Sequence, residues 1–363
     1  MNREDQLFLD ICSFAAPDRA RISDGLSSCT AYDRLLGRLL WHRMGGAAYG
    51  TLRETDLLGA VDREFRSALE TAYRAACMKN ESFSQALCAL GSLLQNMRAP
   101  CAALKGAYLT QVYPAGYRTS NDVDFLLRPE DVSEAADLLE ADGFRQGSVR
   151  NGEFVAASRA EIIYSRMNRG ETVPFVKRIG LPFLEFLEVD LNFSLDYKPE
   201  DGSRTGALLA ERVPLPSGLE TLAPPAFFVH LCTHLYKEAT TYAWVEMRRD
   251  LSLYKFADLY FLLQAYTDAD YLALKRTIRR LGAERECAYA VIGTKRLFGL
   301  DGPALNVFVS DTFGEWYDCL DEVTDPARGK RYLYDLDFCA RFFRNDRIKL
   351  LKEVGGFGKT AHV

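Results

Sequence analysis

Two aspartates, Asp122 and Asp124, lie two residues apart in the largely apolar run 121–127. This run predicts a β-strand, and residues i and i+2 of a strand project from the same face of its sheet. The two carboxylates are therefore expected side by side, which is unfavourable unless positive charge lies between them. Carboxylate oxygens in such a pair suit Mg²⁺ or Mn²⁺. The run thus indicates a sheet that carries a site for a divalent cation.

A glycine turn precedes the two aspartates in the chain. The apolar segment 101–104 predicts a short strand that ends at Lys105 and Gly106, followed by a helix that stops at Pro114. Glycine allows a ligand to approach the backbone closely, and the N–H groups at a helix start attract phosphate. Lys105 can neutralise phosphate charge. The order strand, glycine turn, helix and acidic strand is that of a metal-dependent nucleotide site.

A third acid lies on a later predicted strand. The segment 184–193 alternates strictly between polar and apolar residues, which predicts a half-buried strand. Glu188 and Asp190 lie on its polar face. A carboxylate from a second strand can complete a site in which two metal ions assist phosphoryl or nucleotidyl transfer. We therefore expect Asp122, Asp124 and Asp190 to serve as both the metal ligands and the catalytic residues.

Composition narrows the class of protein. The 363 residues are 48% hydrophobic and 26% charged, which is typical of a soluble globular protein, and the net charge of −5 argues against a broad nucleic-acid surface. The nine cysteines are scattered without a C-x-x-C pair, so we expect reduced thiols and no disulfides. Because no leader peptide and no long apolar span is recognisable, we expect a cytoplasmic protein without a membrane segment.

The periodicity predicts an α/β (α+β) fold with three regions. These are an N-terminal helical region (1–98), a core with a small mixed sheet (99–200) and a C-terminal helical domain (215–363) that closes the nucleotide cleft. Short strands are expected at 154–157 and 161–164 in the core. A final helix near 335–353 is expected to expose its basic residues to solvent.

These residues resemble a known family. The segments 104–106 and 121–131, with Tyr113 and Arg118 between them, are similar to a pattern of the uncharacterised bacterial nucleotidyltransferase family of the DNA polymerase β-like superfamily. The segment 188–193 occupies the place of that family's later acidic strand. The resemblance covers about residues 80 to 265, and its two-aspartate segment is the most specific part.

The resemblance implies a transfer reaction and a set of contacts. It implies that a nucleoside monophosphate moves from a nucleoside triphosphate, most simply ATP, to an acceptor, with release of pyrophosphate. It implies metal binding by the three aspartates and phosphate contact near Gly106. Lys105, Arg118, Ser120 and Lys237 complete the candidate nucleotide-binding residues.

Two positions depart from the pattern. The superfamily usually has Gly-Ser at the turn, whereas this chain has Ala107 after the glycine, so one hydroxyl contact is missing. Asn192 stands where the family tends to have His. The spacing from Gly106 to Asp122 is also longer than in the superfamily's antibiotic-modifying enzymes.

The acceptor and the reaction class leave alternatives open. The acceptor is expected to be a small molecule, peptide or protein rather than RNA, because the chain is acidic. A metal-dependent glycosyltransferase also uses a D-x-D pair. A non-catalytic member that binds a nucleotide or a partner protein fits the missing serine. A toxin-like enzyme that adds nucleotides to tRNA is a further alternative.

Overall fold

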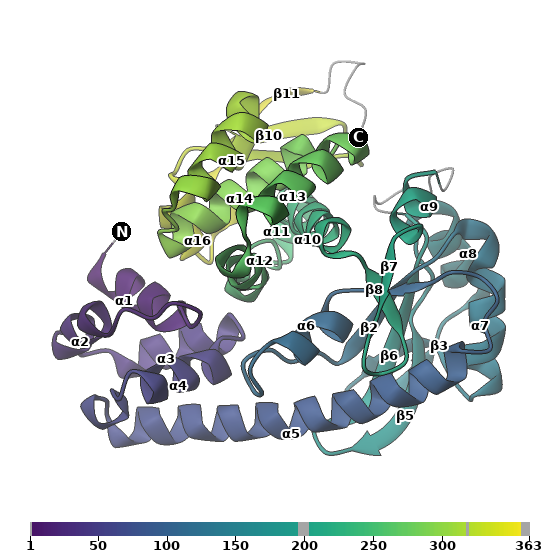
Figure 1. Ribbon diagram of the computed structural model, residues 1–363, viewed down its shortest axis with the longest axis horizontal. Coiled ribbons are helices and arrows are strands. Elements are labelled where there is room, and N and C mark those ends of the chain that lie inside the picture. Colours follow the sequence, from purple (N-terminus) through teal and green to yellow (C-terminus); the bar gives the residue numbers. More distant parts are fainter. Residues whose placement is uncertain (1, 195–202, 317–318, 357–363) are drawn as a thin grey trace. The chain divides into compact units, whose positions relative to one another are not determined.

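The computed structural model describes residues 2–194, 203–316 and 319–356, and its elements are labelled in Figure 1. The chain divides into two compact units. One is Ala68–Phe227, called here the sheet unit, and the other combines Met1–Ser67 with Phe228–Val363, called the helical unit. The domain limits expected from the sequence stay predictions, and the limit at residue 200 lies outside the described residues.

The sheet unit is built on a sheet whose strands run in both directions. Their order is β4-β3-β5-β6-β2-β1-β8-β7. β2 pairs in parallel with β6 and β1 in parallel with β8, whereas the other neighbours are antiparallel, so the predicted mixed sheet is confirmed. The strands are β1 (Ala102–Ala103), β2 (Asp122–Leu126), β3 (Arg145–Arg150), β4 (Glu153–Ala156), β5 (Phe175–Leu181), β6 (Leu184–Asn192), β7 (Arg212–Pro214) and β8 (Glu220–Leu222).

Helices in the sheet unit follow the sequence pattern closely. The long helix α5 buries Phe83, Leu87, Leu90 and Leu94, the residues whose spacing predicts an amphipathic helix, in one core with the sheet. The same core includes apolar residues of β2, β6 and α7. The helical elements are α5 (Arg63–Leu94), α6 (Gly106–Val112), η2 (Pro129–Asp131), α7 (Val132–Ala141), α8 (Arg159–Asn168) and α9 (Ser203–Leu209).

One predicted strand in the core is wrong. The segment 161–164 lies inside helix α8, which begins with a reciprocal capping box between Ser158 and Glu161. The Ser158 hydroxyl accepts from the Glu161 N–H, and the Glu161 carboxylate accepts from the Ser158 N–H. The S-x-x-E spacing is a helix-start signal that outweighs the short apolar run after it.

The helical unit contains most of the remaining helices and a small antiparallel sheet of order β11-β10-β9. Its helices are α1 (Arg3–Cys12), α2 (Arg19–Ser27), α3 (Tyr32–Trp41), α4 (Gly45–Glu54), η1 (Leu58–Ala60), α11 (Tyr242–Glu246), α12 (Leu253–Ala265), α13 (Asp268–Leu281), α14 (Glu284–Phe298), α15 (Pro303–Phe313), η3 (Gly314–Trp316), η4 (Cys319–Asp321), α16 (Phe338–Phe342) and η5 (Arg347–Leu350). Its strands are β9 (Glu322–Asp325), β10 (Lys330–Tyr334) and β11 (Leu351–Gly356). Helix α10 (Pro224–Ala239) crosses from the sheet unit into this unit.

The expected final basic helix is also wrong. The segment 335–353 forms α16, η5 and the start of β11 instead of one helix. Two of its arginines, Arg341 and Arg347, are buried rather than solvated. Arg341 pairs with Asp321 and Arg347 with Asp250, which lie 20 and 97 residues away in the chain. These partners cannot be recognised from local charge patterning.

Two further findings concern the whole described chain. No described helix has the length and apolarity needed to cross a membrane. The nine cysteines are all free thiols.

Candidate active site

The three predicted aspartates lie on two adjacent parallel strands. Asp124 on β2 is the direct partner of Asp190 on β6, and Asp122 is the partner of Glu188. Neighbouring strands lie about 4.8 Å apart, and residues i and i+2 are separated by roughly 6.6 Å along a strand. Residues at paired positions share one face, as do residues two apart, so the structure brings Asp122, Asp124 and Asp190 together.

Lys105 supplies positive charge inside this group. It follows β1, the antiparallel neighbour of β2, and the Leu104 N–H donates to the Asp124 carbonyl oxygen at 2.8 Å. The Lys105 ammonium donates to Asp124 Oδ1 at 2.7 Å. Its backbone has φ of +45°, which side-chain-bearing residues rarely adopt. Such strain, of order 1–3 kcal/mol, persists where the surroundings fix the conformation, and it is common at functional sites.

The electrostatics show that one lysine does not balance the carboxylates. Burial, and then the charges of Asp124 and Asp122, raise the pKa of Asp190 well above its ordinary value, and Lys105 offsets only part of this. Burial alone would raise the pKa of Asp122 as well. Lys105, the Ser120 hydroxyl and Arg118 together lower it. Burial and the charge of Asp122 raise the pKa of Glu188. The group therefore holds an excess of negative charge.

Gly106 and Ser120 are packed against each other. A Cβ at residue 106 would lie 2.3 Å from Ser120 Oγ, so no side chain fits at the start of α6. The Ser120 hydroxyl donates to Asp122 Oδ1 at 2.8 Å. Ala107 is fully buried in the core. A hydroxyl therefore lies beside the glycine turn, and it comes from the loop before β2 and not from position 107.

The loop before β2 is tied to helix α5. Asn80 accepts from the Gly116 N–H at 2.9 Å and donates to the Arg118 carbonyl oxygen at 2.8 Å. The Arg118 guanidinium donates to the carbonyl oxygen of Thr119. Arg118 lies close enough to Asp122 to lower the pKa of that carboxyl. Asn80 is a positioning residue that the sequence did not single out, because it lies on a helix with no motif around it.

Two more residues join the group, Asn192 from the polar side of β6 and Glu171 from the segment beside it. Asn192 donates to Asp124 Oδ1 at 3.4 Å. Glu171 pairs with Asn192 in an isolated antiparallel bridge, and its charge contributes to the raised pKa of Asp190. The alternation of β6 places Asn192 on this face, so the pattern could have identified it, whereas Glu171 lies outside any recognisable strand.

The donor set suits a hard divalent cation. Its side-chain donors are oxygens, and three carboxylates share one ammonium. Within residues 2–194, 203–316 and 319–356, no three His, Cys, Asp or Glu side chains already have the arrangement of a metal centre. Lys105 occupies Asp124 Oδ1, so a cation that used this oxygen would displace the ammonium.

The last candidate residue belongs to a different unit. Lys237 lies on the part of α10 within the helical unit, so it is not among the residues grouped here. Its contact with a nucleotide stays a prediction.

Comparison with known proteins identifies a matching family model. A family model described as an uncharacterised nucleotidyltransferase matches residues 28–299, which is about three quarters of the chain. No curated protein and no solved structure matches the chain.

Proposed function

Because the chain belongs to this uncharacterised nucleotidyltransferase family, we propose that it transfers a nucleoside monophosphate, most simply AMP from ATP, to an acceptor group. The observation that carries the proposal is the direct pairing of Asp124 and Asp190 on adjacent parallel strands, with Asp122 on the same face. In this reaction an acceptor oxygen or nitrogen forms a bond to the α-phosphorus. The bond from that phosphorus to the pyrophosphate oxygen breaks, and pyrophosphate leaves.

Each residue of the group has a role in this proposal. Asp122 and Asp124 supply the negative charge that would hold the divalent cation of a metal–triphosphate complex. Asp190 accepts the proton that the acceptor group loses. The backbone N–H of Gly106 binds a phosphate oxygen, since the next two N–H groups of α6 already donate to backbone carbonyl oxygens. Ser120 supplies the hydroxyl that Ala107 lacks, and Arg118 binds phosphate from the same loop.

A divalent cation, Mg²⁺ or Mn²⁺, would be held by Asp122, Asp124 and Asp190. When bound, such ions neutralise phosphate charge and stabilise the attacking and leaving oxygens. With Asp124 holding such a cation, the Lys105 ammonium would be available to pair with a phosphate oxygen. The same side chain would then serve as counterion in the nucleotide-free protein and as phosphate ligand in the complex.

The test is a transfer assay with each of the four nucleoside triphosphates. The protein is incubated with Mg²⁺, α-³²P-labelled nucleotide and cell extract, and both labelled products and pyrophosphate are measured. We expect label to pass to an acceptor with stoichiometric pyrophosphate release. Asp190→Asn should reduce the rate by at least about 100-fold, since it removes a group that acts in the transition state.

A matched control is Glu185→Gln. Glu185 lies on β6, like Asp190, but its carboxylate is exposed and pairs with Arg178. This substitution should leave the rate unchanged. Release of a nucleoside diphosphate from the labelled triphosphate would indicate γ-phosphoryl transfer. Turnover of a nucleotide sugar, with release of its nucleoside diphosphate, would indicate sugar transfer. Either outcome would contradict the proposal. Binding of Mg-nucleotide without turnover would mean that the protein binds nucleotides but does not catalyse transfer. Full activity of Asp190→Asn would show that this carboxylate is not the proton acceptor.

A further inference from the structure

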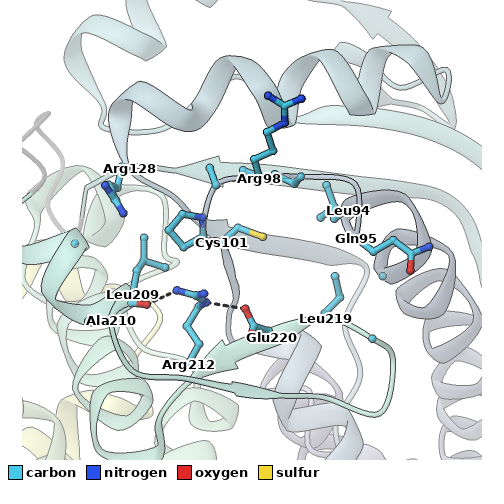
Figure 2. A pocket seen from close by; sticks show the side chains of 16 residues that line it. Leu94, Gln95, Arg98, Cys101, Arg128, Leu209, Ala210, Arg212, Leu219 and Glu220 are labelled. Carbon is cyan, nitrogen blue, oxygen red and sulfur yellow. Dashed lines mark hydrogen bonds and ion pairs between the residues drawn. The ribbon is translucent and has the colours of Figure 1, made fainter.

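A polar pocket lies within the sheet unit, away from the three aspartates. It has a volume of about 570 Å³, within the range of small-molecule sites. Its walls are the end of α5 with the loop that follows it, the second residue after β2, the C-terminal part of α9 and the starts of β7 and β8 (Figure 2). It is therefore enclosed by elements of one unit.

The pocket is positively charged, although the whole chain is acidic. Arg98, Arg128 and Arg212 line it, with Glu220 as the acid among the lining residues that the structure describes. Arg212 donates to Glu220 at 2.7 Å and to the Leu209 carbonyl oxygen, as Figure 2 shows. Arg98 and Arg128 are both exposed, but the Arg98 side chain points away from Arg212 in Figure 2.

Arg128 is poorly satisfied by its neighbours. Its closest carboxylate oxygens, on Glu130 and Asp131, lie at 3.8 and 3.9 Å, beyond hydrogen-bond range. Arg212 has hydrogen bonds from Nε and Nη1, which leaves Nη2 available as a donor within the described part of the chain. Two guanidinium groups from different elements thus offer donors to the same space.

The lining also restricts what can enter. No aromatic side chain lines the pocket among the described residues, so nothing there can stack on a nucleobase. Guanidinium groups that approach from two directions match the oxygens of a tetrahedral anion better than those of a planar carboxylate. The volume leaves room for several carbon atoms besides one phosphate group.

We propose that this pocket binds a small phosphate ester, with its phosphate group held by Arg128 and Arg212. The site is distinct from the three aspartates. Cys101 precedes β1 and Arg128 follows β2, whereas Lys105 follows β1 and Asp122 begins β2. Because these two strands are antiparallel, the pocket lies at one end of them and the carboxylates at the other, roughly four residues or 13 Å away.

The test measures binding of glycerol 3-phosphate to the full chain by calorimetry at constant ionic strength, with glycerol and inorganic phosphate as comparison ligands. We expect glycerol 3-phosphate to bind, glycerol not to bind, and inorganic phosphate to bind more weakly than the ester. Inorganic phosphate binding as tightly as the ester would overturn the assignment of an ester, and absence of ester binding would overturn the site.

Variants with opposite expected effects locate the binding. Arg128→Gln should weaken ester binding about tenfold, because it removes a charged hydrogen-bond donor. Glu220→Gln should strengthen binding severalfold, since it frees Arg212 from a competing carboxylate. Arg178→Gln, at an exposed arginine of the same unit outside the pocket lining, is the control and should change affinity by less than about twofold.

The same titration with Asp190→Asn separates this site from the proposed reaction. Ester binding should be unchanged in that variant, so loss of transfer and loss of ester binding are independent results. Ester binding that is unaffected by both Arg128→Gln and Glu220→Gln would overturn the proposal.

Discussion

Two groups of buried charge in this protein differ in how well they are balanced. In the helical unit, Arg347 donates to both carboxylate oxygens of Asp250 at 2.7 and 2.6 Å, and the two side chains are 6% and 0% exposed. In the sheet unit, one ammonium, that of Lys105, is surrounded by the carboxylates of Asp122, Asp124 and Asp190.

This difference in charge balance distinguishes a group that stabilises the fold from a group that is suited to binding a ligand. A bidentate, one-to-one pair is satisfied within the fold, and it needs nothing further. A group with excess negative charge is less stable than it would be with neutral residues, and such groups are typical of sites that bind a cation or perform proton transfer. An excess of one charge in a buried cluster therefore indicates a candidate ligand-binding site.

The largest expected effect comes from breaking the balanced pair. Asp250→Asn leaves the buried Arg347 without a counterion, and we expect the free energy of unfolding to fall by about 4 kcal/mol. Urea titration followed by circular dichroism measures this change. Asp346→Asn, in the exposed pair with Arg344, is the control and should leave the midpoint unchanged. A similar midpoint for the two variants would mean that the buried pair does not stabilise the helical unit.

Removing the lysine ammonium from the group of three aspartates should lower the free energy of unfolding slightly less. Lys105→Met removes the ammonium that is hydrogen-bonded to Asp124, and we expect a loss of about 3 kcal/mol in metal-free buffer. Added Mn²⁺ should restore stability to a greater extent than in the unmodified protein, because the competing ammonium is gone.

Thermal unfolding with and without Mn²⁺ tests this second prediction. Lys177→Met is the matched control, since it removes a lysine from a more exposed pair with Asp142 in the same unit. If Mn²⁺ stabilises Lys105→Met no more than the control, the ammonium and the cation do not compete for Asp124.

Protonation of the buried His42 would place a positive charge without a counterion in the helical unit. His42 is buried, and its Nδ1 accepts from the Leu253 N–H at 3.1 Å. Burial, followed by the charges of Arg347 and Arg38, lowers the pKa of His42 to about 3. The unfolded chain takes up this proton below its ordinary pKa near 6.5, whereas the folded protein stays neutral. Stability is therefore fully present above pH 6.5 and declines as the pH falls towards 3.

By pH 5 this group alone should reduce the free energy of unfolding by about 2 kcal/mol, at roughly 1.4 kcal/mol per pH unit. Urea titrations at pH 7 and pH 5 measure the decline. His42→Gln removes the titrating group, so its decline over this range should be smaller by that amount. An equal decline in both proteins would contradict the assigned pKa.

The smallest effect is expected from relieving the excess charge. Asp190→Asn removes one negative charge from the sheet unit, and we expect stability in metal-free buffer to rise by up to about 1 kcal/mol while transfer is lost. Differential scanning calorimetry provides the measurement. A marked loss of stability would show that the Asp190 carboxylate is needed for the fold and not for the reaction.

The sequence predicted those parts of the site that depend on strand periodicity. The side-chain period of two predicts that Asp122 and Asp124 share a face and that Asp190 lies on the polar side of its strand. The parallel register that pairs Asp124 with Asp190 could not be predicted, because it depends on which strands become neighbours. The amphipathic face of α5 was equally readable from its spacing.

Other parts had no local signal. Ser120 and Asn80 act through loop geometry that no periodicity describes. The basic residues near the C-terminus were misread because local patterning treats charge as solvated, whereas Arg347 has its partner 97 residues earlier. The capping box at Ser158 is a local signal, and it outweighs the apolar run after it, which alone predicts a strand.

The contact between Gly106 and Ser120 links two positions of the chain that lie fourteen residues apart. Since the serine Oγ and Cβ already fill the space where a side chain of residue 106 would stand, residue 106 cannot enlarge alone. In related chains, a side chain at position 106 should therefore be accompanied by glycine at position 120. The turn and the loop before β2 then evolve as a single unit.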